Sequence, residues 1–311
     1  MSSTRPPLII HHKGCNDGIC GALILWIGLS DAELRAYHYN WEPPTDDDLR
    51  DRDVWMVDFS FPRETLEHIN EVANRLVVLD HHGTAEANCV GLDFATFDMN
   101  KCGAMLAYER MEAEGVLDLF SESSRSMLLR LVQYVQDRDL WLWEMENSKA
   151  VNAWLATFPK DLPSWVWILD IFCDADATLM LPQVVKEGEA ILRSNNNLVN
   201  IVVSQAWRGT ALPWMGKPRV TAWIANTPIL QSDVGHALVE RGDTDCAVMW
   251  RRASGGRYFY SIRSRVSGGI EGGTFDTAAL ASIFGGGGHK AASGFTSDLP
   301  PWKLFEEDTD E

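Results

Sequence analysis

The first half of the chain alternates short apolar segments with longer segments of helical periodicity. The apolar segments contain β-branched residues and have the length of strands buried on both faces. Apolar residues then recur at the spacing of one helix face. We predict strands over residues 8–10, 54–57 and 76–79, and helices starting at residue 17 and over residues 63–74, 103–114 and 124–137. This order predicts an α/β fold, with a mostly parallel sheet covered by helices on both faces.

The second half begins with a polar, helix-compatible stretch over residues 183–197, which ends in three asparagines that predict a cap and a linker. Strands are expected over residues 201–204, 220–224, 246–251 and 258–263, and a helix over residues 276–284. The length of 311 residues fits two domains of about 100–200 residues each. We therefore predict domains over residues 1–185 and 201–311, joined by a helical linker over residues 186–200. The second is a smaller α/β domain that faces the first across a cleft.

The chain carries 44 acidic and 27 basic residues, a formal net charge of −17. Such a field repels polyanions, which excludes a protein that coats long nucleic acids through counterion release. A short phosphorylated substrate stays open, because divalent cations held by carboxylates make a site locally positive. Two acidic runs, over residues 46–48 and 306–311, are interpreted as solvated surface, the first in a loop and the second in a polar tail.

The apolar runs, the N-terminal residues and the cysteines all bear on the compartment of the protein. The longest strongly apolar run, over residues 21–29, is shorter than the roughly 20 residues that cross a bilayer. The first seven residues lack the pattern of a signal peptide. Six cysteines form no CxxC pair and no disulfide framework. These features predict a cytoplasmic protein with no membrane partner, and they leave open whether it forms a homodimer.

Polar side chains directly follow three predicted strands: His11, His12 and Asp17 after the first, Asp58 after the second, and Asp80, His81 and His82 after the third. Open α/β sheets bind ligands beyond the carboxyl ends of their strands. Buried aspartates are costly there unless they are paired or bound to metal. Each cluster alone could be a helix cap or a core histidine. Together they predict a site for Mn²⁺ or Mg²⁺, with two cations about 3.5–4 Å apart that clamp a phosphate and activate a water.

Two aspartates, Asp137 and Asp139, end the helical pattern that starts at residue 124. Negative charge at a helix C-terminus opposes the helix dipole, so these carboxylates need a partner. One could complete a metal shell while the other pairs with Arg138 or a neighbour. Their spacing leaves open which does so, and a surface salt bridge is an alternative for both.

A glycine run over residues 285–288 precedes His289 and Lys290. Glycines allow backbone N–H groups to approach an anion closely, although a flexible loop is the simpler reading of glycines alone. Arg263 and Arg265 are two residues apart on a predicted strand and therefore point to the same face, where they could bind phosphate. Together these features predict a second phosphate-binding surface.

These residues, taken together, resemble the DHH phosphoesterase superfamily over nearly the whole chain. The resemblance rests on Asp80-His81-His82, on Asp58, on the segment with His12 and Asp17, and on Asp137, in family order. The segment Gly286-Gly287-Gly288-His289 resembles the signature of the DHH-associated C-terminal domain. The resemblance implies a metal-binding catalytic domain over residues 1–185 and a substrate-binding domain over residues 201–311.

The same resemblance implies a dinuclear, manganese-dependent phosphoester or phosphoanhydride hydrolase, with Mg²⁺ or Co²⁺ as alternative ions. It assigns metal binding to His12, Asp17, Asp58, His81 and Asp137. His82 would meet the substrate phosphate and Asp80 would orient an imidazole. Substrate binding falls to Arg263, Gly286, Gly287, Gly288 and His289.

One segment departs from the family pattern. Many relatives carry Asp-x-Asp where this chain has Cys15-Asn16-Asp17. We favour His12 over His11 as the ligand, because it matches a subgroup that reads His-Lys-x-Cys-x-Asp-Gly. Whether Cys15 joins the metal shell or is a small buried residue stays open, as does the role of His11.

The leading hypothesis is a phosphodiesterase that uses a metal-activated water on short nucleotides, such as dinucleotides, nano-RNAs or linear products of cyclic dinucleotides. An exopolyphosphatase or pyrophosphatase would use the same metals without recognising a base. A third class is a nucleotide-binding module with impaired catalysis, for which the departure at Cys15 is the supporting feature.

Overall fold

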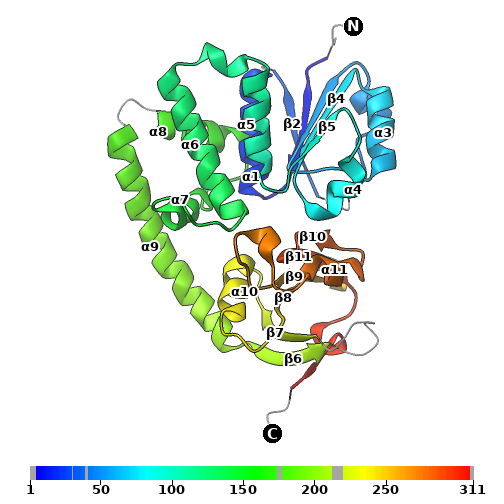
Figure 1. Cartoon of the computed structure of the whole chain (residues 1–311), viewed down its shortest axis with the longest axis vertical. Helices are drawn as coiled ribbons and strands as arrows, with labels where there is room; N and C mark the ends of the chain where they lie inside the picture. The colour runs from blue at the N-terminus through cyan, green and yellow to red at the C-terminus, as the bar shows by residue number, and fades with distance from the viewer. Residues whose placement is uncertain (1–4, 30, 39–40, 174–176, 212–219, 309–311) are drawn as a thin grey trace. The chain divides into compact units, whose positions relative to one another are not determined.

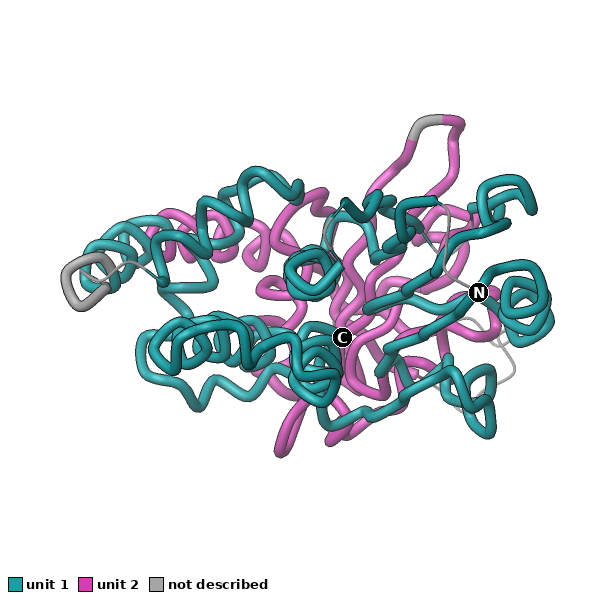
Figure 2. Tube along the Cα trace, turned by 90° about the horizontal axis from the view of Figure 1, so that it is seen from above, with its two compact units in different colours: residues 1–191 teal, residues 192–311 magenta. Residues whose placement is uncertain are grey.

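The computed structural model describes residues 5–29, 31–38, 41–173, 177–211 and 220–308 (Figure 1). The chain divides into two compact units, Met1–Ile191 and Leu192–Glu311 (Figure 2). Each unit has its own sheet and its own hydrophobic core.

The first unit contains a five-stranded sheet in the order β2-β1-β3-β4-β5, and all of its pairings are parallel. Its strands are β1 (Leu8–His12), β2 (Glu33–Tyr37), β3 (Asp53–Val57), β4 (Arg75–Asp80) and β5 (Ala95–Phe97). The three strands predicted from apolar runs are the three central strands. The two strands that the sequence did not reveal lie at the edges, where burial is partial and the apolar signal is weak.

Helices cover both faces of this sheet, as predicted. On one face Ile9, Trp55 and Val77 pack with α1 (Asn16–Gly28), α5 (Gly103–Ala113) and α6 (Glu122–Asp139). On the other face Leu8 and Val54 pack with α3 (Arg63–Val72). Successive strand residues alternate between the two cores, as the two-residue period of a strand requires. The remaining helices of the unit are α2 (Asp46–Leu49), α4 (Glu86–Cys89), α7 (Ser148–Leu155) and α8 (Leu162–Cys173), with 3₁₀ turns at Gly83–Ala85 and Val116–Leu119.

Helix α9 (Ala177–Ser204) crosses the boundary between the units, and the predicted linker over residues 186–200 lies inside it. The expected cap at residues 195–197 and the strand over residues 201–204 are wrong, because the helix continues through both. Val199 and Val203 are one helical turn apart and pack with Val234 and Leu238 of the second unit, which favours helix over strand. Within the described part of the chain, no helix is long and apolar enough to cross a membrane.

The second unit contains a seven-stranded mixed sheet in the order β10-β11-β9-β8-β7-β6-β12, in which only the β7–β8 pairing is parallel. Its elements are β6 (Trp207–Ala211), β7 (Thr221–Asn226), α10 (Gln231–Val239), β8 (Cys246–Arg252), β9 (Tyr258–Arg263), α11 (Thr277–Ser282), β10 (Gly287–Gly288), β11 (Ala292–Ser297) and β12 (Phe305–Glu307), with 3₁₀ turns at Ser254–Gly256, Ile270–Gly272 and Pro301–Lys303. Helix α11 packs on one face of the sheet and α10 on the other. The α/β class predicted for this half is confirmed.

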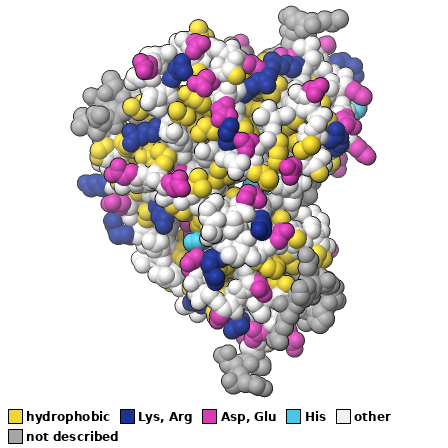
Figure 3. All heavy atoms as spheres, in the orientation of Figure 1, with side chains coloured by type: hydrophobic (Ala, Val, Ile, Leu, Met, Phe, Trp, Pro, Cys, Tyr) yellow, Lys and Arg dark blue, Asp and Glu magenta, His cyan; other side chains and the backbone are white. Residues whose placement is uncertain are grey.

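The described residues of the two acidic runs are more ordered than expected, and residues 309–311 lie outside the described part of the chain. Residues 46–48 start helix α2, where Thr45 and Asp48 form a reciprocal capping box. Residues 305–307 form the edge strand β12, paired with β6, and Asp308 Oδ2 lies 3.3 Å from Arg208 Nε. On the face shown in Figure 3, acidic and basic side chains of the described residues are interspersed rather than gathered by sign.

Candidate metal centre

The centre of the site lies at the carboxyl ends of β1, β3 and β4, which are neighbours in the parallel sheet. His12 ends β1, Asp58 directly follows β3, and Asp80 ends β4. Parallel strands end at the same edge of a sheet, so their terminal side chains come together. The convergence expected from the sequence is therefore present.

Among the described residues of the first unit, two groups of side chains can each offer ligand atoms within 4.8 Å of one another. The first is His12, Asp58 and His82, and the second is Asp17, His81 and Asp139. Asp58 connects the groups, because its Oδ2 lies 3.5 Å from His12 Nδ1 and its Oδ1 lies 3.3 Å from His81 Nε2. A carboxylate with one oxygen toward each group has the geometry of a bridging ligand.

Asp58 is held in an unusual backbone conformation. Its φ of 56° lies in the left-handed region, which only a few per cent of residues other than glycine adopt. Its N–H donates to the carbonyl of Leu79, which fixes the turn beyond β3. Strain of this kind is sustained where surrounding structure holds it, and it is common at functional sites.

Asp17 is fully buried and is held by the N-terminus of α5. Its two oxygens accept from the backbone N–H groups of Gly103 and Ala104 at 2.6 and 2.7 Å. Burial, followed by the nearby carboxylates of Asp58 and Asp139, raises its pKa well above the usual range. A cation at this position would relieve that repulsion.

Asp58 has different neighbours from Asp17, and its pKa shifts in the opposite direction. Burial alone would raise its pKa, but the nearby imidazoles of His12 and His81 outweigh burial and hold the pKa of Asp58 well below the ordinary value. Burial lowers the pKa of His81, but its hydrogen bond to Asp58 and the charges of Asp139 and Asp17 outweigh burial. Together they raise the pKa of His81 to about 10. In this state the imidazole of His81 supplies the positive charge that balances the carboxylates.

Asp80 is buried and organises the histidine pair. Its Oδ1 accepts from Nδ1 of His82 at 2.8 Å, and its Oδ2 accepts from the hydroxyl of Ser60 at 2.5 Å. The carboxylate of Asp80 raises the pKa of His82, although burial acts in the opposite direction. The structure therefore pairs Asp80 with an imidazole, as the resemblance implied. The sequence reasoning missed Ser60, because a serine after a strand carries no signal of its own.

The fourth acidic position differs from the expected one. Asp139, whose Oδ2 lies 3.5 Å from His81 Nε2, belongs to the second group, and Asp137 belongs to neither. Asp137 instead accepts at Oδ1 from the N–H of Glu144 and at its carbonyl from the N–H of Leu142. Asp137 and Asp139 each lie one helical turn after a buried residue, Tyr134 and Val135 respectively, so helical phase alone does not separate the two aspartates.

Asp137 thereby closes a turn of unusual conformation after α6. Trp141 and Trp143 both have left-handed φ angles, 58° and 59°. The guanidinium carbon of Arg138 lies 4.2 Å from the centre of the Trp141 ring and 5.2 Å from that of Trp143. Hydrogen bonds from Leu142 and Glu144 to Asp137 hold this turn directly beyond Asp139.

The two residues left open in the sequence lie outside both groups. Cys15 caps α1, and burial, with Asp58 next, raises the pKa of its thiol well above the usual range. Cys15 offers no ligand atom to either group. The Nδ1 atom of His11 lies 3.1 Å from the carbonyl of His12, and burial lowers its pKa.

The donor set fits divalent cations. Asp58 Oδ2 is buried and has no hydrogen-bond partner among the described residues. Three carboxylates share this region with the imidazoles, and burying several carboxylates without a cation is costly. Carboxylate oxygens with imidazole nitrogens suit Mn²⁺, whereas a closed structural zinc site favours thiolates.

In the second unit, the glycine run is a packed hairpin rather than a flexible loop. Gly287 and Gly288 form β10 and pair with β11. A Cβ at Gly286 would lie 2.2 Å from the carbonyl oxygen of Gly294, and Gly288 has a φ of 138°, so both positions require glycine.

His289 follows this hairpin and is buried, with its Nδ1 hydrogen-bonded to Glu271. Arg263 lies on β9, opposite Ala292 of β11, and donates to the hydroxyls of Ser261 and Ser232. Adjacent strands thus bring the predicted substrate-binding residues of this unit into one region. Arg265 lies beyond the end of β9, where it donates to the carbonyl of Val239.

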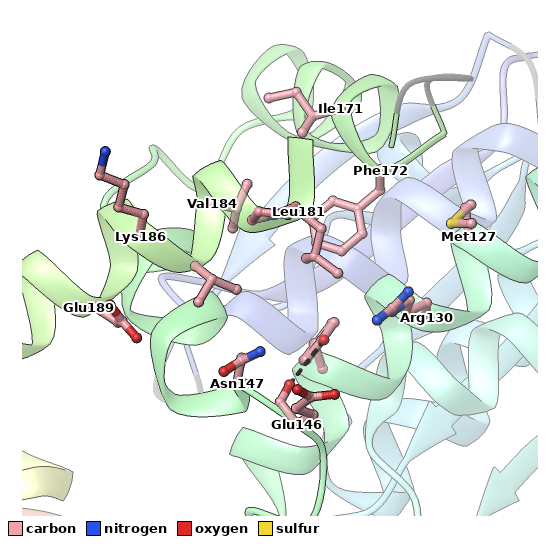
Figure 4. A pocket seen from close by; sticks show the side chains of 13 residues that line it. Met127, Arg130, Glu146, Asn147, Ile171, Phe172, Leu181, Val184, Lys186 and Glu189 are labelled. Atoms are coloured by element: carbon pink, nitrogen blue, oxygen red, sulfur yellow. Dashed lines mark hydrogen bonds between the residues drawn. The ribbon is translucent and has the colours of Figure 1, made fainter. Parts of the chain in front are cut away.

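A separate pocket of about 510 Å³ lies among the helices of the first unit (Figure 4). Its walls include Tyr134 and Phe172, and Arg130 and Glu146 stand at its border. None of the residues of the two metal groups lines it.

Comparisons with known proteins agree with this architecture. No protein-family model matches the chain. The uncharacterized protein R106 of Acanthamoeba polyphaga mimivirus is 25% identical over 92% of the chain, which spans 66% of that protein. RecJ from Thermus thermophilus, solved with Mn²⁺, superposes with a TM-score of 0.51 at 16% identity, over 93% of this chain and 49% of RecJ. The chain therefore shares the fold of RecJ.

The likeness to RecJ confirms the α/β fold that was predicted from the sequence. A further structure, a pGpG-specific phosphodiesterase from Vibrio cholerae, matches with a TM-score of 0.48 at 14% identity, over 94% of this chain and 93% of that protein. At these identities the comparison concerns the fold, and the chemistry of this chain has to be argued from its own residues.

Proposed function

We propose that the chain is a divalent-metal-dependent phosphodiesterase that hydrolyses short phosphorylated nucleotides. The observation that carries the proposal is the carboxylate of Asp58, which has one oxygen toward each of two ligand groups. Paired cation sites of this kind occur in enzymes that cleave phosphate esters. Dinucleotides, nano-RNAs and linear products of cyclic dinucleotides are the substrates of suitable length.

In this proposal, His12 and Asp58 hold one cation and Asp17, Asp58, His81 and Asp139 hold the other. Asp139 replaces Asp137, for the geometric reason given above. Two Mn²⁺ ions are the proposed occupants, supported by the Mn²⁺ in the RecJ structure, with Mg²⁺ and Co²⁺ as alternatives. Cations in such sites neutralise phosphate charge and make water a stronger nucleophile.

The protein's own groups bind and orient the substrate. His82, held by Asp80, offers an imidazole toward a phosphate oxygen, and the raised pKa favours its charged form. The Asp80–Ser60 contact restricts the carboxylate that sets the orientation of His82. Arg263, His289 and the hairpin over residues 286–288 bind a second phosphate of the substrate and select its length, in our proposal. The cytoplasmic location, the cleft and a homodimer remain predictions.

The test is hydrolysis by purified protein in Mn²⁺, with 5′-phosphorylated dinucleotides, cyclic dinucleotides and polyphosphate as substrates. We expect turnover of the linear dinucleotides. Asp58→Asn retains a residue that tolerates the left-handed conformation but removes the bridging charge, and should reduce turnover by at least about a hundredfold. The matched control is Asp31→Asn, at an exposed aspartate that also has a left-handed φ.

Wild-type turnover by Asp58→Asn in Mn²⁺ would overturn the dinuclear proposal. Turnover of polyphosphate without turnover of any dinucleotide would replace the phosphodiesterase by an exopolyphosphatase. Metal and nucleotide binding with no turnover of any substrate would identify a binding module.

A further inference from the structure

Aromatic rings extend from the first metal group along the edge of the first unit. The ring centres of His12 and His38 are 6.4 Å apart, and those of His38 and Trp41 are 5.3 Å apart. The N–H of Trp41 donates to the carbonyl of His38 at 3.0 Å, which ties the two rings to one turn. We name Tyr37, His38 and Trp41 the aromatic shelf.

The shelf is anchored in the core through Tyr37, and Trp41 is its exposed end. Tyr37 packs edge to face on Phe61 with ring centres 5.7 Å apart, and lies 6.1 Å from Phe59, both in the buried core. Trp41 packs on Tyr37 but leaves 46% of its own surface exposed. Single exposed apolar side chains are common. This indole differs because an ordered aromatic cluster holds it next to a ligand group.

Trp41 also lines a surface hollow. The hollow has a volume of about 580 Å³ and is bordered by Arg35, Ala36, Tyr37, Trp41 and Glu42. Small-molecule sites occupy roughly 300–1,000 Å³, so the space can hold a nucleobase with its sugar.

A cation accompanies the shelf. Lys13 directly follows His12, and its Nζ lies 4.5 Å from the centre of the Trp41 ring. The backbone N–H of Lys13 donates to the carbonyl of Tyr37 at 2.8 Å, so the lysine is held to the strand that carries the shelf. The surface thus offers an aromatic face, then an ammonium group, then a group of candidate metal ligands. These three features match the base, the adjoining phosphate and a second phosphate of one ligand.

We propose that the aromatic shelf is the base-binding site of the first unit, with a nucleobase stacked on the indole of Trp41 and Lys13 placed to contact an adjoining phosphate. The proposal rests on the proposed function and deepens it, because a polyphosphate has no group that would use an aromatic face. Stacking tolerates every base, so the shelf selects for base-bearing substrates without selecting a sequence.

The test measures binding rather than turnover. Adenosine 5′-monophosphate and ribose 5-phosphate share the sugar phosphate and differ by the base. Isothermal titration of the full chain in Mn²⁺ should show that the wild type prefers the nucleotide by between about fivefold and a hundredfold. Trp41→Ala should abolish the preference while binding ribose 5-phosphate as the wild type does, and Trp41→Phe should restore most of it.

The matched control is Trp167→Ala, at a half-exposed tryptophan of α8 that packs on Phe158, and it should keep the wild-type preference. Equal binding of the two probes by the wild type, or an unchanged preference in Trp41→Ala, would overturn the base site. A base preference that depends on Trp41 supports the shelf even if no dinucleotide is hydrolysed, in which case the proposed function alone fails.

Discussion

At the scale of single residues, the candidate metal centre depends on which of two similar aspartates lies near its ligand groups. Asp137 and Asp139 are two residues apart at the end of α6, yet only Asp139 lies near His81. The carboxylate of Asp137 accepts from a backbone N–H of the following turn. Asp139 therefore lies with the ligand groups, whereas Asp137 holds the turn that follows α6 through hydrogen bonds.

This division predicts different effects of two conservative variants. Asp139→Asn removes an anionic ligand and should lower the affinity for Mn²⁺ by more than about tenfold. Asp137→Asn retains an oxygen that can accept from Glu144 and should bind Mn²⁺ nearly as the wild type does. Titration of Mn²⁺ into each protein measures both values. A loss of affinity in Asp137→Asn as large as that in Asp139→Asn would return the ligand role to Asp137.

At the scale of elements, α5 and the turn after β3 are packed so closely that only a glycine fits between them. A Cβ at Gly103 would lie 2.8 Å from the backbone nitrogen of Asp58. The same helix end donates two hydrogen bonds to Asp17. The position of α5 therefore controls two acidic residues at once.

Gly103→Ala should consequently damage the site through the backbone. We expect a loss of about 1–3 kcal/mol in the free energy of unfolding, from overpacking, together with weaker Mn²⁺ binding. Urea unfolding and metal titration measure the two effects. Gly28→Ala is the control, since the nearest neighbours of its Cβ would be side-chain atoms of Met111 and Val116 rather than backbone of the site. If the two variants bind Mn²⁺ equally well, the close contact between α5 and Asp58 does not control the site.

At the scale of the whole molecule, the two units carry different candidate functions. The groups of the metal centre all belong to the first unit, whereas Arg263, His289 and the glycine hairpin belong to the second. Residues that bind a remote part of a substrate act on positioning and substrate choice. The proposed function assigns this role to the second unit.

Arg263→Ala and His289→Ala should therefore leave Mn²⁺ affinity unchanged while reducing hydrolysis of a dinucleotide. Loss of one charge-assisted phosphate contact costs about 1.5–3 kcal/mol, or roughly ten- to a hundredfold. Bis-p-nitrophenyl phosphate is too short to use the second site and should lose much less. Steady-state rates on both substrates give the comparison. Equal losses on the two would place these residues in the chemistry itself.

Much of the fold and of the metal centre could be predicted from local patterns. The central strands of the first unit are short apolar runs, and polar residues follow each of them, so the neighbouring strand ends could be inferred to meet. This pattern and the family resemblance pointed to His12, Asp17, Asp58 and His81, whose side chains the structure brings close together. The edge strands β2 and β5 were missed, because partly buried strands carry a weaker hydrophobic signal.

Only the tertiary structure decided features that depend on side-chain direction and on packing between distant segments. It separated Asp139 from Asp137, because which carboxylate faces His81 depends on how the last turn of α6 packs. It showed that Gly287 and Gly288 form a strand, because they pair with β11, which lies later in the chain. It also placed His38 between His12 and Trp41, although Trp41 lies 29 positions after His12 in the sequence. Local sequence determined which elements form, and contacts between distant segments determined which side chains meet.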